Sequence, residues 1–439
     1  MSGRETALQV LMACRKDGGW SNGVLKAYTA RNRLDSREAA LAARLCYGVL
    51  QNRGKLDFYL NQLLRSKGKT LHPVVRDILH LGLYQLLEMD KIPDSAAVNE
   101  AVLLTRQYCP GQKNAPGFVN GVLRNAARSR DTLKEPQDWE SLYSHPAELI
   151  SLFKERLGGK RLEAMLRANN EIAPLAVQVN TLKTTAEGLT KTLEAQGVEV
   201  RPHSFMENCL ILSGTGNLEH LSAFREGLFY VQDPASKLAV QCAQLPENQD
   251  FQVLDCCAAP GGKSFAAAIA MGGRGHVTSC DIHPHKIELI QKGAQRLGLT
   301  NLNAMVQDAA AFVPQWEKTM DAVLADVPCS GYGIIRKKPD IRYKDPKTME
   351  NLPALQGQIL ANQARYVKPG GVLIYSTCTI LRRENEGVVE SFLQEHRDFF
   401  LEKLPLPPVF GEENHGMLTL IPGEQETDGF FISRLRREK

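Results

Sequence analysis

The chain has 439 residues, of which 43% are hydrophobic and 23% are charged, close to the average of folded globular domains. This balance excludes a disordered, collagen-like or low-complexity protein. The length predicts two to four domains at roughly 100–200 residues each. No apolar run approaches the ~18 residues that cross a bilayer, and the first residues lack the apolar core of a signal peptide. We therefore expect a soluble, cytoplasmic protein with no membrane partner.

Cysteine usage argues against a metal centre. None of the ten cysteines is spaced from another as C-x2-C, so the usual zinc patterns are missing and we predict no metal. A long chain without an export signal is also a poor candidate for disulfides. Most of these cysteines are expected to be small buried apolar residues.

Charge is distributed unevenly along the chain. Residues 1–140 carry a balance of +7, whereas the remaining 299 residues carry −3. A basic first domain suits a polyanion such as a nucleic acid. Ordinary solvated helix faces would give the same excess, so charge alone leaves both interpretations open.

The first part of the chain has the apolar spacing of successive helices. Ser36 is placed to cap one of them, and the polar, proline-containing stretch 132–145 is typical of a linker. The pattern predicts an all-helical domain over residues 1–140 with a core of its own. Apolar residues recur at helical spacing within residues 7–12, 39–50 and 75–87.

The next part, residues 146–240, mixes the two periodicities. Two short helical stretches precede the alternating segment 175–180, which predicts a strand. A helix at 186–196 and three further strand-like stretches follow. We predict a small α+β domain, and we expect it to contact RNA.

From residue 241 to 439, short apolar runs that end in Asp or Gly alternate with helices. This alternation predicts an α/β domain with a parallel sheet covered on both faces. In such sheets ligands bind beyond the carboxyl ends of the strands, so the residues that follow each strand are the candidates for chemistry. The predicted strands are 253–255, 276–281, 304–308, 322–326, 372–376 and a late strand at 430–435.

The loop after the first of these strands is rich in small residues and opens a helix. It is neither G-x-G-x-x-G nor a P-loop, because the glycine spacing differs. Glycines there allow close approach to a ligand at the helix N-terminus. The predicted cofactor loop is Cys257, Ala258, Ala259, Pro260, Gly261, Gly262 and Lys263.

Acidic residues end the following strands. Asp281 is placed to accept hydrogen bonds from ribose hydroxyls, and Asp308 from an adenine amino group. Asp326 ends the fourth strand, and Asp255 ends the first. One such acid is more often a helix cap, but four around one crevice favour a nucleoside that carries positive charge. S-adenosylmethionine, a sulfonium cation, fits this pattern better than an anionic dinucleotide.

Two cysteines follow neighbouring strands, Cys329 after the fourth and Cys378 after the fifth. Either alone would be expected to be buried. Two thiols at one sheet edge instead favour methylation at C5 of a pyrimidine, where a thiolate adds to C6 and makes C5 nucleophilic. Asp326 is predicted to hydrogen-bond the cytosine edge, and Lys263 to stabilise charge. A base stacked in RNA must be extruded to reach such a pocket.

A basic segment follows Cys329 closely. Its cations are interleaved with apolar and aromatic residues, which suits phosphate contact and base stacking, although a bare charge run would be only a solvated loop. The residues predicted to contact RNA are Arg336, Lys337, Lys338 and Arg342.

These motifs together resemble a known family. Residues 257–263, 326–331 and 334–342, with Ser-Thr-Cys-Thr at 376–379 and Glu-Asn-Glu at 384–386, are similar to the Sun/Nop2-type RNA cytosine-5 methyltransferases over residues 230–439. The N-terminal helices, with Asn-Gly-Val-Leu-Arg at 120–124, resemble NusB, an RNA-binding fold. The combination resembles the bacterial enzymes of this family that methylate 16S ribosomal RNA.

The resemblance implies a class I, Rossmann-like methyltransferase domain over residues 241–439, with S-adenosylmethionine as cofactor. It implies that Cys378 is the nucleophile and that Cys329 assists release of the methylated base. The loop 257–263, with Asp281, Asp308 and Asp326, matches cofactor-contacting positions. It also implies a monomer that acts on 16S ribosomal RNA, naked or in a partly assembled small subunit.

Three other interpretations remain. Transfer RNA as substrate would use the same site chemistry. A non-catalytic RNA-binding or assembly factor would be expected to have lost a thiol or a strand-end acid, and this chain retains them. DNA cytosine methylation would make Cys329 the nucleophile and leave Cys378 without a role, and the RNA-binding resemblance of the helical domain argues against it.

Overall fold

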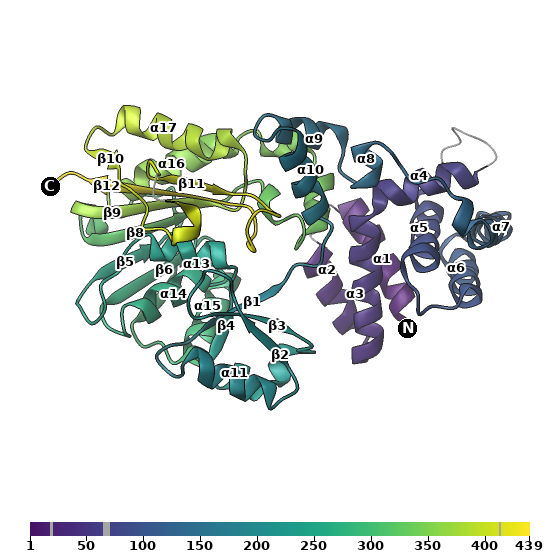
Figure 1. Ribbon diagram of the computed structural model, residues 1–439, viewed down its shortest axis with the longest axis horizontal. Helices are drawn as coiled ribbons and strands as arrows, with labels where there is room; N and C mark the ends of the chain where they lie inside the picture. The colour runs from purple at the N-terminus through teal and green to yellow at the C-terminus, as the bar shows by residue number, and fades with distance from the viewer. Residues whose placement is uncertain (18–20, 65–70, 412–413) are drawn as a thin grey trace. The chain divides into compact units, whose positions relative to one another are not determined.

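The computed structural model describes residues 1–17, 21–64, 71–411 and 414–439. The chain divides into two compact units, whose elements are labelled in Figure 1. One unit comprises Met1–Glu171 together with Ile335–Asp345, and the other comprises Ile172–Ile334 together with Pro346–Lys439. No helix among the described residues is long and apolar enough to cross a bilayer.

The first unit is helical throughout its described residues, as the apolar spacing predicted. Residues of α1 to α7 build one continuous apolar cluster. Its helices are α1 (Gly3–Asp17), α2 (Ser21–Arg31), α3 (Ser36–Gln51), α4 (Arg53–Leu63), α5 (Pro73–Glu88), α6 (Asp94–Tyr108), α7 (Ala115–Arg128), α8 (Trp139–Leu142), α9 (Ala147–Lys154) and α10 (Gly159–Ala168), with 3-10 turns η1 (Arg130–Thr132) and η5 (Pro339–Tyr343).

Local chemistry sets two features of this unit. The cap of α3 is Asp35, one residue before the predicted Ser36, because the Asp35 carboxylate accepts the Glu38 amide at 2.8 Å from an extended backbone. Helix α5 is buried on most sides, and Gly82 lets it approach α7: a Cβ there would lie 2.6 Å from a methyl carbon of Leu123.

The compact first unit extends past residue 140 and takes in α9 and α10. The three-domain division at residues 140, 146 and 240 rests on sequence patterns and stays a prediction.

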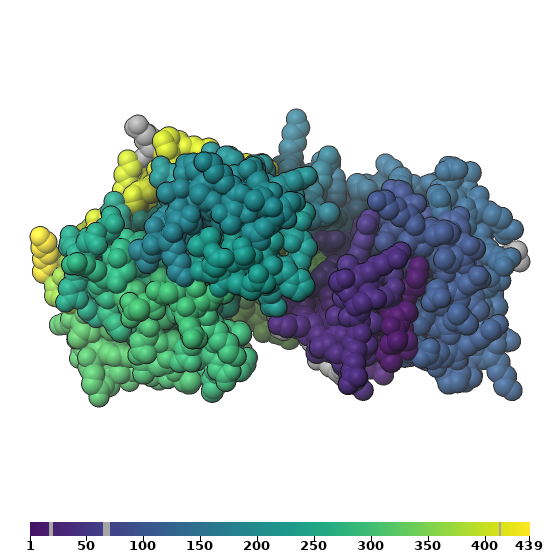
Figure 2. All heavy atoms as spheres, turned by 90° about the horizontal axis from the view of Figure 1, so that it is seen from below, coloured from purple at the N-terminus to yellow at the C-terminus, as the bar shows by residue number. Residues whose placement is uncertain are grey.

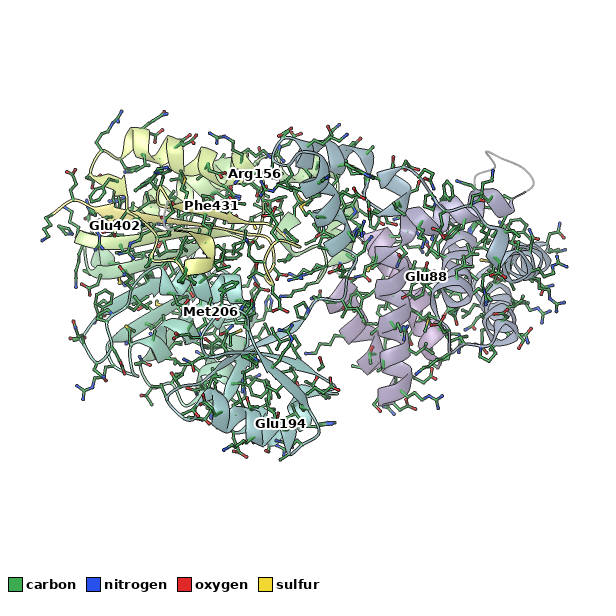
Figure 3. The ribbon with its side chains drawn as sticks, in the orientation of Figure 1. Glu88, Arg156, Glu194, Met206, Glu402 and Phe431 are labelled. Atoms are coloured by element: carbon green, nitrogen blue, oxygen red, sulfur yellow. The ribbon has the colours of Figure 1, made fainter. Side chains whose placement is uncertain are left out.

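The second unit begins with a small antiparallel sheet in the order β2-β3-β1-β4. One face packs against α11 and α12, and the other shares an apolar core with α13 and α14. Met206, labelled in Figure 3, belongs to that shared core. The elements are β1 (Leu175–Val179), α11 (Ala186–Glu194), β2 (Glu199–Pro202), β3 (Cys209–Ser213), η2 (Leu218–His220), α12 (Ser222–Arg225), β4 (Phe229–Val231) and α13 (Pro234–Gln241).

The second sheet has eight strands in the order β10-β12-β9-β8-β5-β6-β7, with β11 paired to β12. Its elements are β5 (Gln252–Asp255), α14 (Gly262–Ala270), β6 (His276–Asp281), α15 (Pro284–Leu297), β7 (Leu302–Val306), η3 (Pro314–Trp316), β8 (Met320–Asp326), η4 (Tyr332–Ile334), η6 (Pro346–Met349), α16 (Leu352–Ala364), β9 (Val367–Thr377), η7 (Arg382–Glu384), α17 (Glu386–Glu395), β10 (Phe399–Leu401), η8 (Pro408–Phe410), β11 (Met417–Leu420) and β12 (Phe430–Arg437).

Strands β5 to β9 pair in parallel, as predicted, but the sheet is mixed. Strands β10, β11 and β12 are antiparallel to their neighbours, which the strand–helix alternation did not reveal. The third strand ends at Val306, so Asp308 lies two residues beyond it rather than at its end.

Both faces of the large sheet are covered. Along β8, Ala322 and Leu324 face the core formed with α13, α14 and α15, while Val323 and Ala325 face the core formed with α16 and α17. Phe431 of β12 lies on the second face (Figure 3). In Figure 2 the teal residues of the small sheet adjoin the green residues of the large one, as their shared core requires. This packing leaves the carboxyl edge of β5 to β9 as the place where polar side chains gather.

Candidate active site

The loop between β5 and α14 is shaped by two glycines. Gly261 has a φ of 111°, and a Cβ there would lie 2.4 Å from the Phe265 ring. At Gly262 a Cβ would lie 3.1 Å from Nε2 of Gln232. The turn therefore requires glycine at position 261, whereas a side chain at position 262 would require only that Gln232 shift slightly.

Asp255, at the end of β5, is fully buried beneath this loop. One carboxylate oxygen accepts the Ser264 hydroxyl at 2.7 Å, and the other has no hydrogen-bond partner among the described residues. Burial raises the pKa of Asp255 to about 6, against the lowering effect of Ser264 and Lys263. Sequence reasoning noted Asp255 as a strand-end acid but did not assign it to the site.

The two predicted nucleoside-binding acids differ in exposure. Asp281, at the end of β6, is 6% exposed; it accepts the His283 amide at 3.0 Å and lies 3.5 Å from the Lys286 ammonium. Asp308 is exposed, and its carboxylate accepts the Ala310 amide at 2.9 Å. Both carboxylates accept the amide two residues further along the chain, so the two acids differ in burial rather than in local geometry. Their cofactor roles stay predictions.

Lys263 and Asp326 form an ion pair at the centre of the edge, with Nζ and Oδ2 separated by 2.6 Å. The second oxygen of Asp326 accepts the Ser376 hydroxyl at 2.8 Å. Lys263 also lies 3.4 Å from the Ser236 hydroxyl and 5.1 Å from the centre of the Phe430 ring. Burial lowers the pKa of Lys263, but the Asp326 carboxylate more than offsets this and raises it above its ordinary value. Lys263 is therefore held as a cation beside the strand ends.

The thiols of Cys329 and Cys378 meet across neighbouring strands. Their sulfurs are 3.1 Å apart, both side chains are half-buried, and both are free thiols. The pairing of Asp326 with Ser376 in the parallel register of β8 and β9 explains this, because the cysteines follow those residues by three and two positions. The predicted juxtaposition is present.

Electrostatics separates the two thiols. The hydrogen bond with Cys378, then burial, then the negative charges of Glu384 and Asp326 raise the pKa of Cys329 well above its ordinary value. These effects disfavour the Cys329 thiolate, and two thiols this close cannot both ionise readily. Either sulfur can donate the hydrogen bond between them.

Glu384 joins the two cysteine turns, and sequence reasoning did not name it as a site residue. Its carboxylate is fully buried and accepts the Ser330 amide at 2.9 Å and the Gln356 amide group at 3.0 Å. Gln356 also donates to the Pro328 carbonyl at 2.9 Å, so the turn that carries Cys329 is held from both sides. An acid shortly after the nucleophile was the only sequence signal, and it entered only through the family resemblance.

The turn after Cys378 is fixed by similar bonds. The Thr377 hydroxyl donates to Asn385 at 2.6 Å, and Asn385 donates to the Thr379 carbonyl at 3.0 Å. The Ser330 hydroxyl donates to that of Thr379 at 2.8 Å, which ties this turn to the turn of Cys329. The thiols are thus set in rigid, mutually bonded turns rather than in free loops.

The burial of Arg342 within the first unit argues against its predicted contact with RNA, which stays a prediction. Arg342 is 2% exposed. Its guanidinium donates to groups of the first unit at 2.8–3.2 Å: the carbonyls of Gln51, Tyr143, Ser144 and Asn169 and the side chain of Asn170. Burial lowers its pKa to about 10. Its role is therefore to join segments of that unit.

The other cations of the basic segment differ among themselves. Arg336 is 8% exposed, so its burial also argues against a surface phosphate contact. Lys337 and Lys338 are half-exposed, and their contact with RNA stays a prediction. Within the described residues, no group of three or more His, Cys, Asp or Glu side chains is arranged to hold a metal ion.

Comparison with known proteins places the chain. A family model described as 16S rRNA methyltransferase RsmB/F matches residues 242–436; the NusB family model matches residues 1–128, and an RsmF/B-like ferredoxin-like domain model matches residues 145–219. The probable ribosomal RNA small subunit methyltransferase B of Bacillus subtilis is 37% identical, over 99% of this chain and 98% of that one. The chain belongs to the RsmB/F family of 16S rRNA methyltransferases.

Further relatives agree with the family assignment. A probable ribosomal RNA small subunit methyltransferase B from Synechocystis is 33% identical over 100% of both chains. The solved structure of PH0851 has a TM-score of 0.79 and 26% identity to this RsmB/F member, covering 100% of it and 99% of that chain. The predicted architecture, a NusB-like helical part, a small α+β part and a methyltransferase part, is confirmed, and so is the prediction of an rRNA methyltransferase.

Proposed function

We propose that this protein transfers a methyl group from S-adenosylmethionine to C5 of a cytosine in 16S ribosomal RNA through a covalent bond between Cys378 and C6. The observation that carries the proposal is the pair of thiols, 3.1 Å apart at the strand edge, beside the Lys263–Asp326 pair. This arrangement supplies a nucleophile, a proton carrier and a charged pair to one small region.

The residues at and after the ends of β5 and β6 fit the cofactor. Asp281 is a buried acceptor of the kind that ribose hydroxyls need, and the unpartnered oxygen of Asp255 adds negative charge behind the glycine turn. Such carboxylates suit a nucleoside with a sulfonium better than they suit a phosphate. When bound, S-adenosylmethionine supplies an electrophilic methyl group.

The chain's own groups divide the remaining work. The Cys378 thiolate adds to C6 of the cytosine, and the ring electrons move to C5, which becomes nucleophilic. After methylation C5 carries both a methyl group and a proton. With Cys378 bonded to C6, Cys329 can release its own proton to solvent, and the Cys329 thiolate then takes the C5 proton. The C5–C6 double bond forms again, and the Cys378 sulfur leaves as a thiolate.

Asp326 and Lys263 are placed to hold the target base. The carboxylate can accept from the cytosine N4 amino group, and the ammonium can stabilise negative charge on the ring after thiolate addition. The two side chains are paired with each other at 2.6 Å, so a base that enters the site meets polar groups rather than apolar side chains. The target must leave its stack to do so.

Mapping 5-methylcytosine in RNA from cells that lack the gene tests the proposal. We expect one cytosine of 16S rRNA to lose its methyl group and to regain it when the wild-type chain, but not Cys378→Ala, is returned. Purified protein should methylate 16S rRNA either as free RNA or as a partly assembled subunit. Loss of methylation in transfer RNA with intact 16S rRNA would overturn the substrate assignment.

A further inference from the structure

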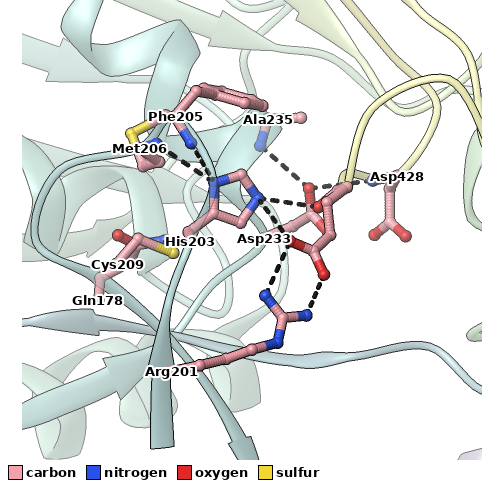
Figure 4. Close-up of polar contacts among 10 residues, drawn as sticks. Gln178, Arg201, His203, Phe205, Met206, Cys209, Asp233, Ala235 and Asp428 are labelled. Carbon is pink, nitrogen blue, oxygen red and sulfur yellow. Dashed lines mark hydrogen bonds and ion pairs between the residues drawn. The ribbon is translucent and has the colours of Figure 1, made fainter. Parts of the chain in front are cut away.

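The connection between β11 and β12, residues 421–429, links the small sheet to the catalytic turns within the second unit. We call it the 421–429 loop. Although it lies in the methyltransferase part of the sequence, some of its polar contacts are made with β2 and with the start of α13 (Figure 4). Its other contacts reach the turn of Cys378 and, through the residue that follows it, Lys263.

On the side of the small sheet, Glu426 is held by Arg201 of β2 and by His203, which follows this strand. The Arg201 guanidinium forms a two-pronged ion pair with the Glu426 carboxylate, one contact measuring 3.0 Å. The buried ring of His203 donates from Nε2 to the backbone carbonyl of Glu426 at 3.0 Å. Figure 4 shows the two side chains, that of Arg201 on β2 and that of His203, the residue just after this strand.

The role of His203 in this contact is fixed by its other ring nitrogen. Nδ1 faces the backbone amides of Phe205 and Met206, at 3.4 Å and 3.2 Å, and can only accept from them. The proton of the neutral ring is therefore on Nε2, where it donates to Glu426. The ring is thus locked in position and in tautomer.

A third contact comes from Asp233, which caps α13. The same carboxylate oxygen accepts the Ala235 amide at 3.0 Å and the Asp428 amide of the loop at 3.2 Å. Asp233 therefore bonds the start of α13 to the loop. The same helix start lies near Lys263, because the Ser236 hydroxyl is 3.4 Å from the Lys263 ammonium.

On the catalytic side, the loop ends in backbone contact with Gly333, which in turn is bonded to the backbone of Cys378. The Gly429 amide donates to the Gly333 carbonyl at 2.8 Å, and the Gly333 amide donates to the Cys378 carbonyl at 2.9 Å. A Cβ on Gly333 would lie 2.0 Å from the Gly429 carbonyl oxygen. There is no free space here, so a shift of the loop must move the Cys378 turn.

Lys263 is touched by the next residue in the chain. The ring centre of Phe430 is 5.1 Å from its ammonium, a cation–π distance. One short stretch, Glu426 to Phe430, therefore spans from the small sheet to both the nucleophile's turn and the charged pair.

We propose that the small α+β domain sets the catalytic position of Cys378 and Lys263 through the 421–429 loop, with His203 and Arg201 as positioning residues. The inference rests on the proposed function and adds to it: the small domain does more than contact RNA. Misplacement by a fraction of an ångström at a thiolate that must meet C6 costs rate without costing binding.

The test uses His203→Asn in the full chain, because an asparagine oxygen can replace Nδ1 as acceptor for the two amides but cannot reach Glu426. Arg201→Ala removes the ion pair, and Glu199→Gln, at an exposed position of the same strand, is the matched control. Each change is made in a Cys329→Ala background, where RNA is expected to remain attached through Cys378. The measured quantities are the rate of adduct formation with 16S rRNA and the affinities for S-adenosylmethionine and for that RNA.

We expect His203→Asn to slow adduct formation by about tenfold or more, with both affinities within about twofold of the parent. Arg201→Ala should slow it less, and adding Glu426→Arg to Arg201→Glu should restore rate lost by Arg201→Glu alone. The control should match the parent. An unchanged rate in His203→Asn, or a rate loss that merely follows loss of RNA affinity, would overturn the positioning role. A parent that forms no adduct would overturn the proposed function itself.

Discussion

Lys263 is a largely buried cation and Arg342 a fully buried one, and their surroundings differ in a way that separates chemistry from structure. Lys263 faces one carboxylate, that of Asp326, and a few hydroxyl and aromatic neighbours at the strand edge. Arg342 is surrounded by backbone carbonyls and one side-chain amide of the helical unit. The first cation has a partner that a substrate can share, whereas the second has partners that belong to the backbone.

The physical lesson concerns what a buried charge can exchange. A side-chain carboxylate can rotate and accept a hydrogen bond from an incoming base, so the ion pair can become part of a binding site. Backbone carbonyls cannot leave without unfolding the segments that carry them, so each bond to Arg342 is a bond between segments. The two cations should therefore respond oppositely to removal, one in rate and the other in stability.

The largest expected effect is on catalysis at Lys263. Lys263→Met keeps much of the side-chain volume but removes the charge that we propose stabilises the ring after thiolate addition. Single-turnover methylation should slow by about 10²–10³-fold, the usual loss for one charge-stabilising group. The melting temperature should change little. A stable, fully active Lys263→Met protein would contradict the role given to this cation.

The second effect is on stability at Arg342. Arg342→Ala leaves several buried carbonyls without donors, at roughly 1–3 kcal/mol each, so the free energy of unfolding should fall by about 3 kcal/mol or more. Denaturant unfolding measures it, with Lys338→Ala as a half-exposed control. If Arg342→Ala instead keeps its stability and loses RNA affinity with a shallower salt dependence, the original RNA assignment would be right after all.

Glu384 is a third charged group for this comparison and lies beside the thiols. It is a buried acid whose partners are backbone and side-chain amide donors. Glu384→Ala frees the turn of Cys329, and release of methylated RNA should slow by about 10–100-fold, seen as a Cys378-linked adduct in a chain with both thiols. Glu384→Gln keeps an acceptor and should release faster than the alanine variant. Glu390→Ala, an exposed acid of α17, should behave as wild type.

The smallest effect is expected at Asp281. Its carboxylate is predicted to accept ribose hydroxyls, so Asp281→Ala should weaken S-adenosylmethionine binding by about 1.5 kcal/mol, or roughly tenfold. Calorimetry measures this affinity. The same measurement on Asp308→Ala tests the predicted contact of Asp308 with the cofactor. Unchanged cofactor affinity in Asp281→Ala would remove that residue from the site.

The sequence pattern predicted those features that depend on strand ends. Cys329 and Cys378 meet because parallel strands β8 and β9 end at one edge, and this follows from topology without knowledge of side-chain packing. The antiparallel strand β12 has the same apolar pattern as a parallel one, so its direction was not readable.

Contacts between residues far apart in the sequence could not be predicted from the sequence pattern. Arg342 lies in a basic run, and nothing in that run shows that residues near 50, 143 and 169 bring their carbonyls to it. The contact of His203 with Glu426 joins residues 223 positions apart and has no local signal in the sequence.

The central claim is that Cys378 attacks and Cys329 releases, and one measurement tests it directly. Each cysteine is replaced by alanine, and each variant is incubated with 16S rRNA and S-adenosylmethionine before denaturing electrophoresis. The account predicts a covalent protein–RNA band with Cys329→Ala and none with Cys378→Ala. Because both changes remove the same atoms at one sheet edge, a packing defect would affect both alike. A band with Cys378→Ala and none with Cys329→Ala would contradict the account and give the nucleophile's role to Cys329.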